Sequence, residues 1–104
     1  MVSVVKINKA RNNFTHYIGR DWAGFAQSPL HNPFHVGKDG DREEVLLKFI
    51  DYWYAPEQRR LRRMAMIMIP DGSILGCWCK PLQCHGDIIA GYLMYKSNLF
   101  LNWE

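Results

Sequence analysis

The chain has 104 residues, of which 48% are hydrophobic and 22% are charged. This ordinary composition predicts one soluble folded domain over residues 1–104 and argues against a disordered chain. No apolar run approaches the ~20 residues that span a bilayer, so we expect no membrane association. The first residues lack the charged start, apolar stretch and cleavage site of a signal peptide, so we expect a cytoplasmic protein. The net charge of +3 permits anionic partners without requiring them.

Two short strands are predicted in the first part of the chain. Residues 2–7 are apolar and β-branched, and residues 14–18 form a second short run that ends at Gly19. Residues 21–40 follow neither a helical nor a strand period, and a loop of this length in a compact domain is often functional. Its aromatic side chains lead us to expect that it folds over another part of the molecule.

A helix is predicted to begin after Asp41. Asp41 can cap it, and Glu44 three residues later completes a capping box. One face of this helix then repeats apolar side chains, namely Val45, Leu46, Phe49, Ile50 and Trp53. Ala55-Pro56 interrupts the pattern, because the residue before a proline is pushed out of the α region.

A second helix can begin at Pro56. Its apolar stripe consists of Leu61, Met64, Ala65 and Met68. Residues 64–69 also fit a buried strand, which would form a hairpin through Pro70-Asp71-Gly72, and this alternative stays open.

The last predicted elements are a strand at residues 74–78 and a helix from just after Cys84 to about Ser97. Residues 99–103 fit either a short strand or a packed tail. The resulting order, β-β-α-α-β-α, predicts a small α/β sandwich with a short mixed sheet. Its last strand would be joined to an earlier one by a right-handed crossover.

All three cysteines lie between this last strand and helix, at Cys77, Cys79 and Cys84, and His85 follows directly. In open α/β sheets, the turn from the carboxyl end of a strand into a helix is where ligands bind. In a chain without an export signal, clustered thiols indicate free, catalytic or metal-bound cysteines before disulfides. We therefore expect the functional site at this turn.

Three interpretations of the cysteine cluster stay open. Cys77, Cys79, Cys84 and His85 are the ligand types that zinc prefers, but their spacing differs from that of structural zinc sites. We therefore expect no cofactor and keep zinc as an alternative. In the second interpretation, a helix N-terminus lowers the pKa of the Cys84 thiol and makes it a nucleophile. His85 and Asp87 would then be acid, base or positioning groups. In the third, the cysteines are buried apolar residues.

Four blocks of the sequence form a recognisable set, at the end of the second strand, in the long loop, at a helix start and at the cysteine turn. They read Tyr17-Ile-Gly-Arg20, Asn32-Pro-Phe34, Gly37-Lys-Asp-Gly-Asp-Arg-Glu-Glu44 and Leu75-Gly-Cys-Trp-Cys-Lys-Pro-Leu-Gln-Cys-His-Gly-Asp87. Together they closely resemble the hallmark of a bacterial and phage family, the domain-of-unknown-function family 4326. The resemblance covers nearly the whole chain and implies no particular activity.

The resemblance does nominate the residues that gather in one pocket. The expected catalytic residues are Cys84, His85 and Asp87, and the expected substrate-binding residues are Arg20, Asn32, Phe34, Lys38, Arg42, Trp78 and Cys79. Arginine and lysine beside a helix N-terminus suit a phosphate, and the aromatic side chains can stack on a base. We therefore expect a nucleotide or related phosphorylated metabolite as ligand, and whether the chain is an enzyme stays open.

Some of these residues also have ordinary structural roles open to them. Arg20 and Arg42 can form ordinary surface ion pairs, and residues 32–34 can form a turn with a buried aromatic side chain. Four further arginines surround Leu61 on the second predicted helix, namely Arg59, Arg60, Arg62 and Arg63. We expect them to form a solvated face. The alternative function is a non-catalytic module, metal-stabilised or using this basic helix, that binds nucleic acid or a protein partner, as in a phage accessory role.

Overall fold

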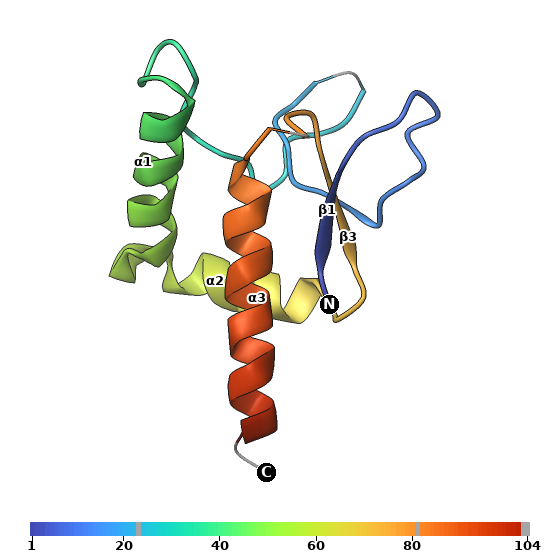
Figure 1. Cartoon of the computed structure of the whole chain (residues 1–104), viewed down its shortest axis with the longest axis vertical. Helices are drawn as coiled ribbons and strands as arrows, with labels where there is room; N and C mark the ends of the chain where they lie inside the picture. The colour runs from blue at the N-terminus through green and yellow to red at the C-terminus, as the bar shows by residue number, and fades with distance from the viewer. Residues whose placement is uncertain (23, 81, 103–104) are drawn as a thin grey trace.

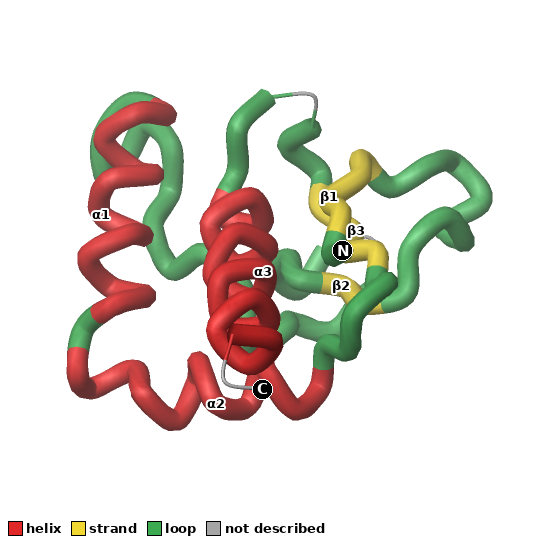
Figure 2. Tube along the Cα trace, turned by 60° about the horizontal axis from the view of Figure 1, so that its bottom comes forward, coloured by secondary structure: helices red, strands yellow, loops and turns green. Residues whose placement is uncertain are grey.

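The structure of the chain is a computed structural model that describes residues 1–22, 24–80 and 82–102, with residues 97–102 described by their backbone only. Over this part of the chain, three strands and three α-helices follow one another in the order that the sequence predicted (Figures 1 and 2). The strands are β1 (Ser3–Lys6), β2 (His16–Tyr17) and β3 (Ile74–Cys77), and the helices are α1 (Arg42–Tyr54), α2 (Arg59–Met68) and α3 (His85–Asn102), with a 3₁₀ turn at Pro56–Gln58. The α/β class and the order β-β-α-α-β-α are confirmed.

β3 is the central strand of the sheet, between β1 and β2. Both neighbours run parallel to it, with Val4 and His16 on either side of Leu75. The sheet is thus parallel rather than mixed, because the chain reaches β3 only after a long crossover through α1 and α2, and such crossovers produce parallel pairs. Antiparallel pairing in the described residues is confined to an isolated bridge between Trp22 and Phe25.

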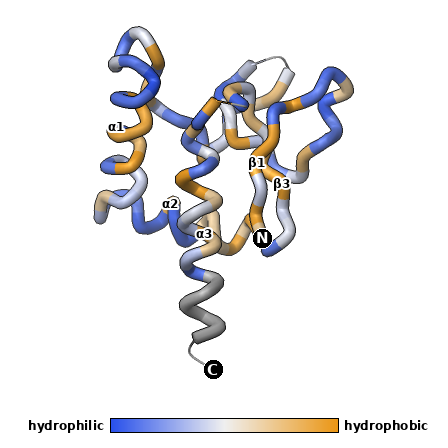
Figure 3. The backbone as a smooth tube through the Cα atoms, in the orientation of Figure 1, coloured by the Kyte–Doolittle hydropathy of each residue, from blue (hydrophilic) through white to orange (hydrophobic). Residues whose placement is uncertain are grey.

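The helix α3 lies between α1 and the sheet, and α2 passes across one end of this arrangement (Figures 1 and 2). Figure 3 shows hydrophobic residues on the strands and on parts of α1 and α3, whereas the first turns of α2 are hydrophilic. The largest fully buried side chains come from α1, α3, β3 and the residue after β2, namely Trp53, Phe49, Ile89, Leu75, Cys77 and Ile18. None of the helices within the described residues is long and apolar enough to cross a membrane.

The start of α1 is the capping box that the sequence predicted. The Asp41 carboxylate accepts the Glu44 backbone N–H at 2.9 Å, and the Glu44 carboxylate accepts the Asp41 N–H at 3.2 Å. Val45, Phe49 and Trp53 are buried at intervals of four residues. Ile50 was expected on the same face but is 38% exposed. The buried stripe is narrower than the predicted apolar face, and Ile50 lies to one side of it.

Two elements correct the sequence-based expectations. Residues 59–68 are helical, so the alternative strand at residues 64–69 is wrong. There, Ala65 is buried and the Arg62 guanidinium donates to the carbonyls of Trp53 and Ala55, which fixes α2 to the end of α1. The last helix continues through residues 99–102 instead of giving way to a strand, since no proline or glycine after Ser97 stops it. Trp103 lies outside the described residues.

Gly86 allows the start of α3 to pack closely against the sheet. A Cβ at this position would lie 2.7 Å from Ile18 Cδ1 and 2.9 Å from Val4 Cγ1. We expect Gly86→Ala to lower the free energy of unfolding by about 1–3 kcal/mol through overpacking. The matched control is Gly91→Ala, also in α3, where a Cβ meets nothing within 4 Å. Because alanine is the better helix former, this control is expected to stabilise by about 0.5–1 kcal/mol.

Urea unfolding of both variants measures the difference. If Gly86→Ala were as stable as Gly91→Ala, the close contact between α3 and the sheet would be contradicted.

Candidate functional site

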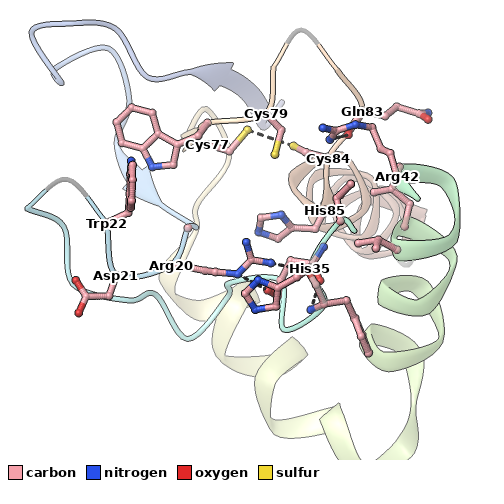
Figure 4. Close-up of a pocket in the computed structure, with 17 residues that line it drawn as sticks. Arg20, Asp21, Trp22, His35, Arg42, Cys77, Cys79, Gln83, Cys84 and His85 are labelled. Carbon is pink, nitrogen blue, oxygen red and sulfur yellow. Dashed lines mark hydrogen bonds between the residues drawn. The ribbon is translucent and has the colours of Figure 1, made fainter. Parts of the chain in front are cut away.

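A cavity of about 440 Å³ opens at the C-terminal ends of β2 and β3 (Figure 4). The first residues of α1 and α3 also reach it, so the N-terminal ends of two helices meet at the cavity. This is the edge at which parallel α/β sheets bind ligands, and the volume falls within the range of about 300–1,000 Å³ for small-molecule pockets. Both helix ends contribute partial positive charge there.

The structure brings most of the predicted site residues to this cavity. Those that line it are Arg20, Asn32, Phe34, Arg42, Trp78, Cys79, Cys84 and His85, together with Cys77 from the zinc alternative. Lys38 and Asp87 are not among the lining residues. Lys38 is exposed in the tight turn in which the Gly37 N–H donates to the Gly40 carbonyl at 2.8 Å.

Sequence reasoning missed several lining residues, namely Gly19, Asp21, Trp22, His35, Val36, Val45, Leu46 and Gln83. Trp22, His35 and Val36 belong to the long irregular loop, whose aromatic content predicted that it covers something. That signal indicated the loop as a whole, and no period or motif singled out these positions within it.

Cys77 and Cys84 form a buried pair of free thiols. Cys77 is the last residue of β3 and Cys84 directly precedes α3, and their sulfur atoms lie 3.2 Å apart. A hydrogen bond from Cys84 lowers the pKa of Cys77 to about 6, helped by the backbone N–H groups of Cys79 and Lys80 and opposed by burial. The same contact and burial raise the pKa of Cys84. A thiolate in this pair is therefore favoured on Cys77, with Cys84 as its hydrogen-bond partner, whereas the sequence had led us to expect it on Cys84.

His85 is buried at the first position of α3. Its Nε2 lies 2.8 Å from the Ile18 carbonyl oxygen and its ring packs edge-on against Phe49. Burial lowers its pKa to about 4, so the ring is neutral at pH 7 and Nε2–H donates to the carbonyl. A nitrogen bound in this way ties α3 to the end of β2, which fits a positioning role better than proton transfer.

Asp87 stabilises the cysteine turn from outside the cavity. One carboxylate oxygen accepts the Cys84 backbone N–H at 3.1 Å, and the other lies 2.6 Å from Lys80 Nζ. The hydrogen bond to Asp87 raises the pKa of Lys80. Asp87 is therefore the first-turn acid that caps α3, and its carboxylate holds the loop between Lys80 and Cys84 in place.

Arg20 fixes the long loop over the cavity. Its Nε donates to the Asn32 carbonyl at 3.1 Å and its Nη2 donates to the Phe34 carbonyl. The Asn32 side chain accepts the Phe34 N–H at 2.9 Å, and the Phe34 ring packs edge-on against Tyr52. Residues 32–34 are thus a turn with a part-buried aromatic side chain, and Arg20 binds backbone carbonyls where a surface ion pair was the plainer expectation.

Two tryptophans that line the cavity, Trp22 and Trp78, belong to an aromatic cluster with Tyr17 and Phe25. Trp78 donates from Nε1 to the Tyr17 hydroxyl at 3.0 Å, and the Tyr17 ring stacks on Phe25 at 4.6 Å between centroids. Trp22 lies at the rim and is 66% exposed. Figure 4 shows Trp22 on one side of the cavity and Arg42 and Gln83 on the other. The cavity therefore has an aromatic side and a cationic side.

The zinc alternative would use Cys77, Cys79, Cys84 and His85, all of which line the cavity. Within the described residues, no group of three or more histidine, cysteine, aspartate or glutamate side chains is placed to hold a metal ion.

Comparison with known proteins places the chain in a family. No curated protein and no solved structure matches it. The family model described as domain of unknown function (DUF4326) matches residues 4–94, a span that includes both strands of the cavity edge, the long loop and the cysteine turn. The chain therefore belongs to the DUF4326 family.

Proposed function

We propose that the cavity at the C-terminal edge of the sheet binds a nucleotide or a related small phosphorylated metabolite. The observation that carries this proposal is that two arginines and several aromatic side chains line one cavity between two helix N-termini. The cationic side fits a phosphate and the aromatic side fits a base.

On the cationic side, Arg42 is the best placed contact for a phosphate. It is the first residue of α1 and donates one long hydrogen bond, 3.3 Å from Nη1 to the Gln83 carbonyl. A guanidinium has five N–H donors in a fork that matches phosphate oxygens, so most of them stay available to a ligand. Arg20 adds a second positive charge while its Nε and Nη2 hold the loop.

On the aromatic side, Trp22 and Trp78 offer ring surface to a base. Trp78 is held in place by its hydrogen bond to Tyr17, and Trp22 is an exposed residue. Stacking of a base on an aromatic side chain is worth about 1–3 kcal/mol and tolerates any base. These contacts therefore support a nucleotide without selecting a particular base.

Chemical processing of the ligand is a separate extension of the proposal. The group that fits it best is the Cys77–Cys84 pair, with a thiolate on Cys77 hydrogen-bonded to Cys84, in place of Cys84 alone. A thiolate is the nucleophilic form of cysteine, and this one lies at the wall of the cavity.

The binding proposal is tested with AMP, ADP, GMP, ribose 5-phosphate and inorganic phosphate, by thermal shift and titration calorimetry. We expect at least one nucleotide to stabilise the wild-type protein. We expect Arg42→Ala to weaken its binding about tenfold or more, because a hydrogen bond to a charged group is worth about 1.5–3 kcal/mol. The matched control is Arg60→Ala, on the exposed surface of α2, which should bind as the wild type does. No response to any compound would contradict the proposal.

The same two variants also test the alternative function, in which the chain is a non-catalytic module that binds nucleic acid through α2. Arg59, Arg60 and Arg63 are exposed, whereas Arg62 is engaged with two carbonyls of the preceding helix. The cluster available to phosphates is therefore smaller than the sequence predicted. Salt-sensitive DNA binding that Arg60→Ala weakens and Arg42→Ala leaves unchanged would favour this alternative.

A further inference from the structure

We propose that Cys77 and Cys84 are a reversible redox pair, which a small-molecule disulfide converts into an intramolecular disulfide between the end of β3 and the start of α3. This activity goes beyond ligand binding and does not depend on it. It belongs to the thiol–disulfide exchange class, with a disulfide such as oxidised glutathione as the co-reactant.

The geometry places the two sulfur atoms close to bonding position. They lie 3.2 Å apart, and an S–S bond of about 2.05 Å therefore needs an approach of about 1 Å. Both ends are held by the fold, because Cys77 is paired to Lys6 across the sheet and α3 is anchored by the bond from His85 to Ile18. The pair is thus pre-positioned and requires no rearrangement of elements.

The cavity provides the route by which an oxidant reaches the pair. Cys77 is 2% exposed and Cys84 is 3% exposed, yet both line the cavity. Figure 4 shows the two sulfur atoms facing each other at the cavity wall. A disulfide bond that enters the cavity therefore meets the two sulfur atoms, which are otherwise buried.

The exchange takes place in two steps. The Cys77 thiolate, stabilised by the N–H groups of Cys79 and Lys80, attacks one sulfur of RSSR. A bond forms between Cys77 and that sulfur, and RS⁻ leaves with the electron pair of the broken S–S bond. RS⁻ takes up a proton to become RSH.

In the second step Cys84 attacks the Cys77 sulfur. The mixed disulfide carries no charge at Cys77, so the largest of the interactions that raised the pKa of Cys84 is lost, while the Gly86 N–H still stabilises a Cys84 thiolate. Cys84 gives up its proton, bonds to Cys77, and the second RS⁻ leaves and takes a proton. Overall two protein thiols lose two electrons and two protons, and RSSR is reduced to two RSH.

Glutathione redox buffers, followed by acid trapping, thiol labelling and tandem mass spectrometry, test the proposal. In the wild-type protein we expect two thiols to disappear together, at Cys77 and Cys84, while Cys79 stays labelled and dithiothreitol restores the pair. Cys79→Ser is the matched control and should behave in the same way. Cys84→Ser should instead accumulate a mixed disulfide with glutathione at Cys77.

Circular dichroism confirms that each variant is folded before it is compared. The proposal is overturned if all three thiols remain labelled in the most oxidising buffer. It is equally overturned if Cys79 replaces either partner in the disulfide, or if Cys77→Ser still loses two thiols.

Discussion

Lowering the pH from 7 to 4 is expected to remove about 3 kcal/mol of folding stability through His85 alone. Burial lowers the pKa of His85 from 6.5 to about 4 in the folded protein. Below pH 6.5 His85 is therefore protonated in the unfolded chain, whereas in the folded protein it stays neutral until the pH approaches 4. The stabilising contribution of the neutral ring is fully present above pH 6.5 and is lost progressively as the pH falls to 4.

Urea unfolding at several pH values, in wild type and in His85→Gln, isolates this effect from that of the carboxylates. A glutamine amide can still donate to the Ile18 carbonyl, but it does not titrate. The wild type should lose about 3 kcal/mol more than the variant between pH 7 and pH 4. Parallel stability curves for the two proteins would show that His85 is not buried as a neutral ring.

Cys77 is expected to react with iodoacetamide with a midpoint near pH 6, the value to which the hydrogen bond from Cys84 lowers its pKa. At pH 6 an ordinary thiol with a pKa of ~8.5 is less than ~1% ionised, whereas Cys77 is about half ionised. The weaker nucleophilicity of a low-pKa thiolate offsets part of this gain, which leaves alkylation about tenfold faster than for an ordinary equally accessible thiol.

Mass spectrometry of the alkylated protein measures this rate from pH 4 to pH 9. In Cys77→Ser, the rise in alkylation rate with a midpoint near pH 6 should disappear. Cys84→Ala removes the donor and should move that midpoint upward, whereas Cys79→Ser should leave it in place. If the reaction with a midpoint near pH 6 persisted in Cys77→Ser and disappeared in Cys84→Ser, the reactive thiolate would be Cys84, and the assignment to Cys77 would be contradicted.

Local patterns predicted the parts of the fold that local chemistry decides. Asp41 and Glu44 lie three residues apart and cap the same helix, so the sequence alone was enough to place the start of α1. The strand, loop and helix around the cysteines were likewise predicted from apolar runs and turn residues, and they form the edge of the cavity.

Contacts that form only in the folded chain explain the features that could not be predicted from the sequence. The pKa of Cys77 depends on a sulfur seven residues away, brought close by the turn from β3 into α3. Arg20 binds the carbonyls of Asn32 and Phe34, which no side-chain pattern encodes. Trp22 and His35 reach the cavity from a loop without a period, so only the folded chain reveals them.

If the thiol pair and the ligand share one cavity, a bound nucleotide will protect Cys77 from alkylation. The measurement is the rate of iodoacetamide reaction at Cys77 at pH 6, across a titration of the nucleotide that stabilises the protein in the thermal-shift experiment. We predict that the rate falls to a plateau, with half of the effect at the dissociation constant found by calorimetry. A nucleotide that binds the protein and leaves the rate at Cys77 unchanged at saturation would contradict the shared site.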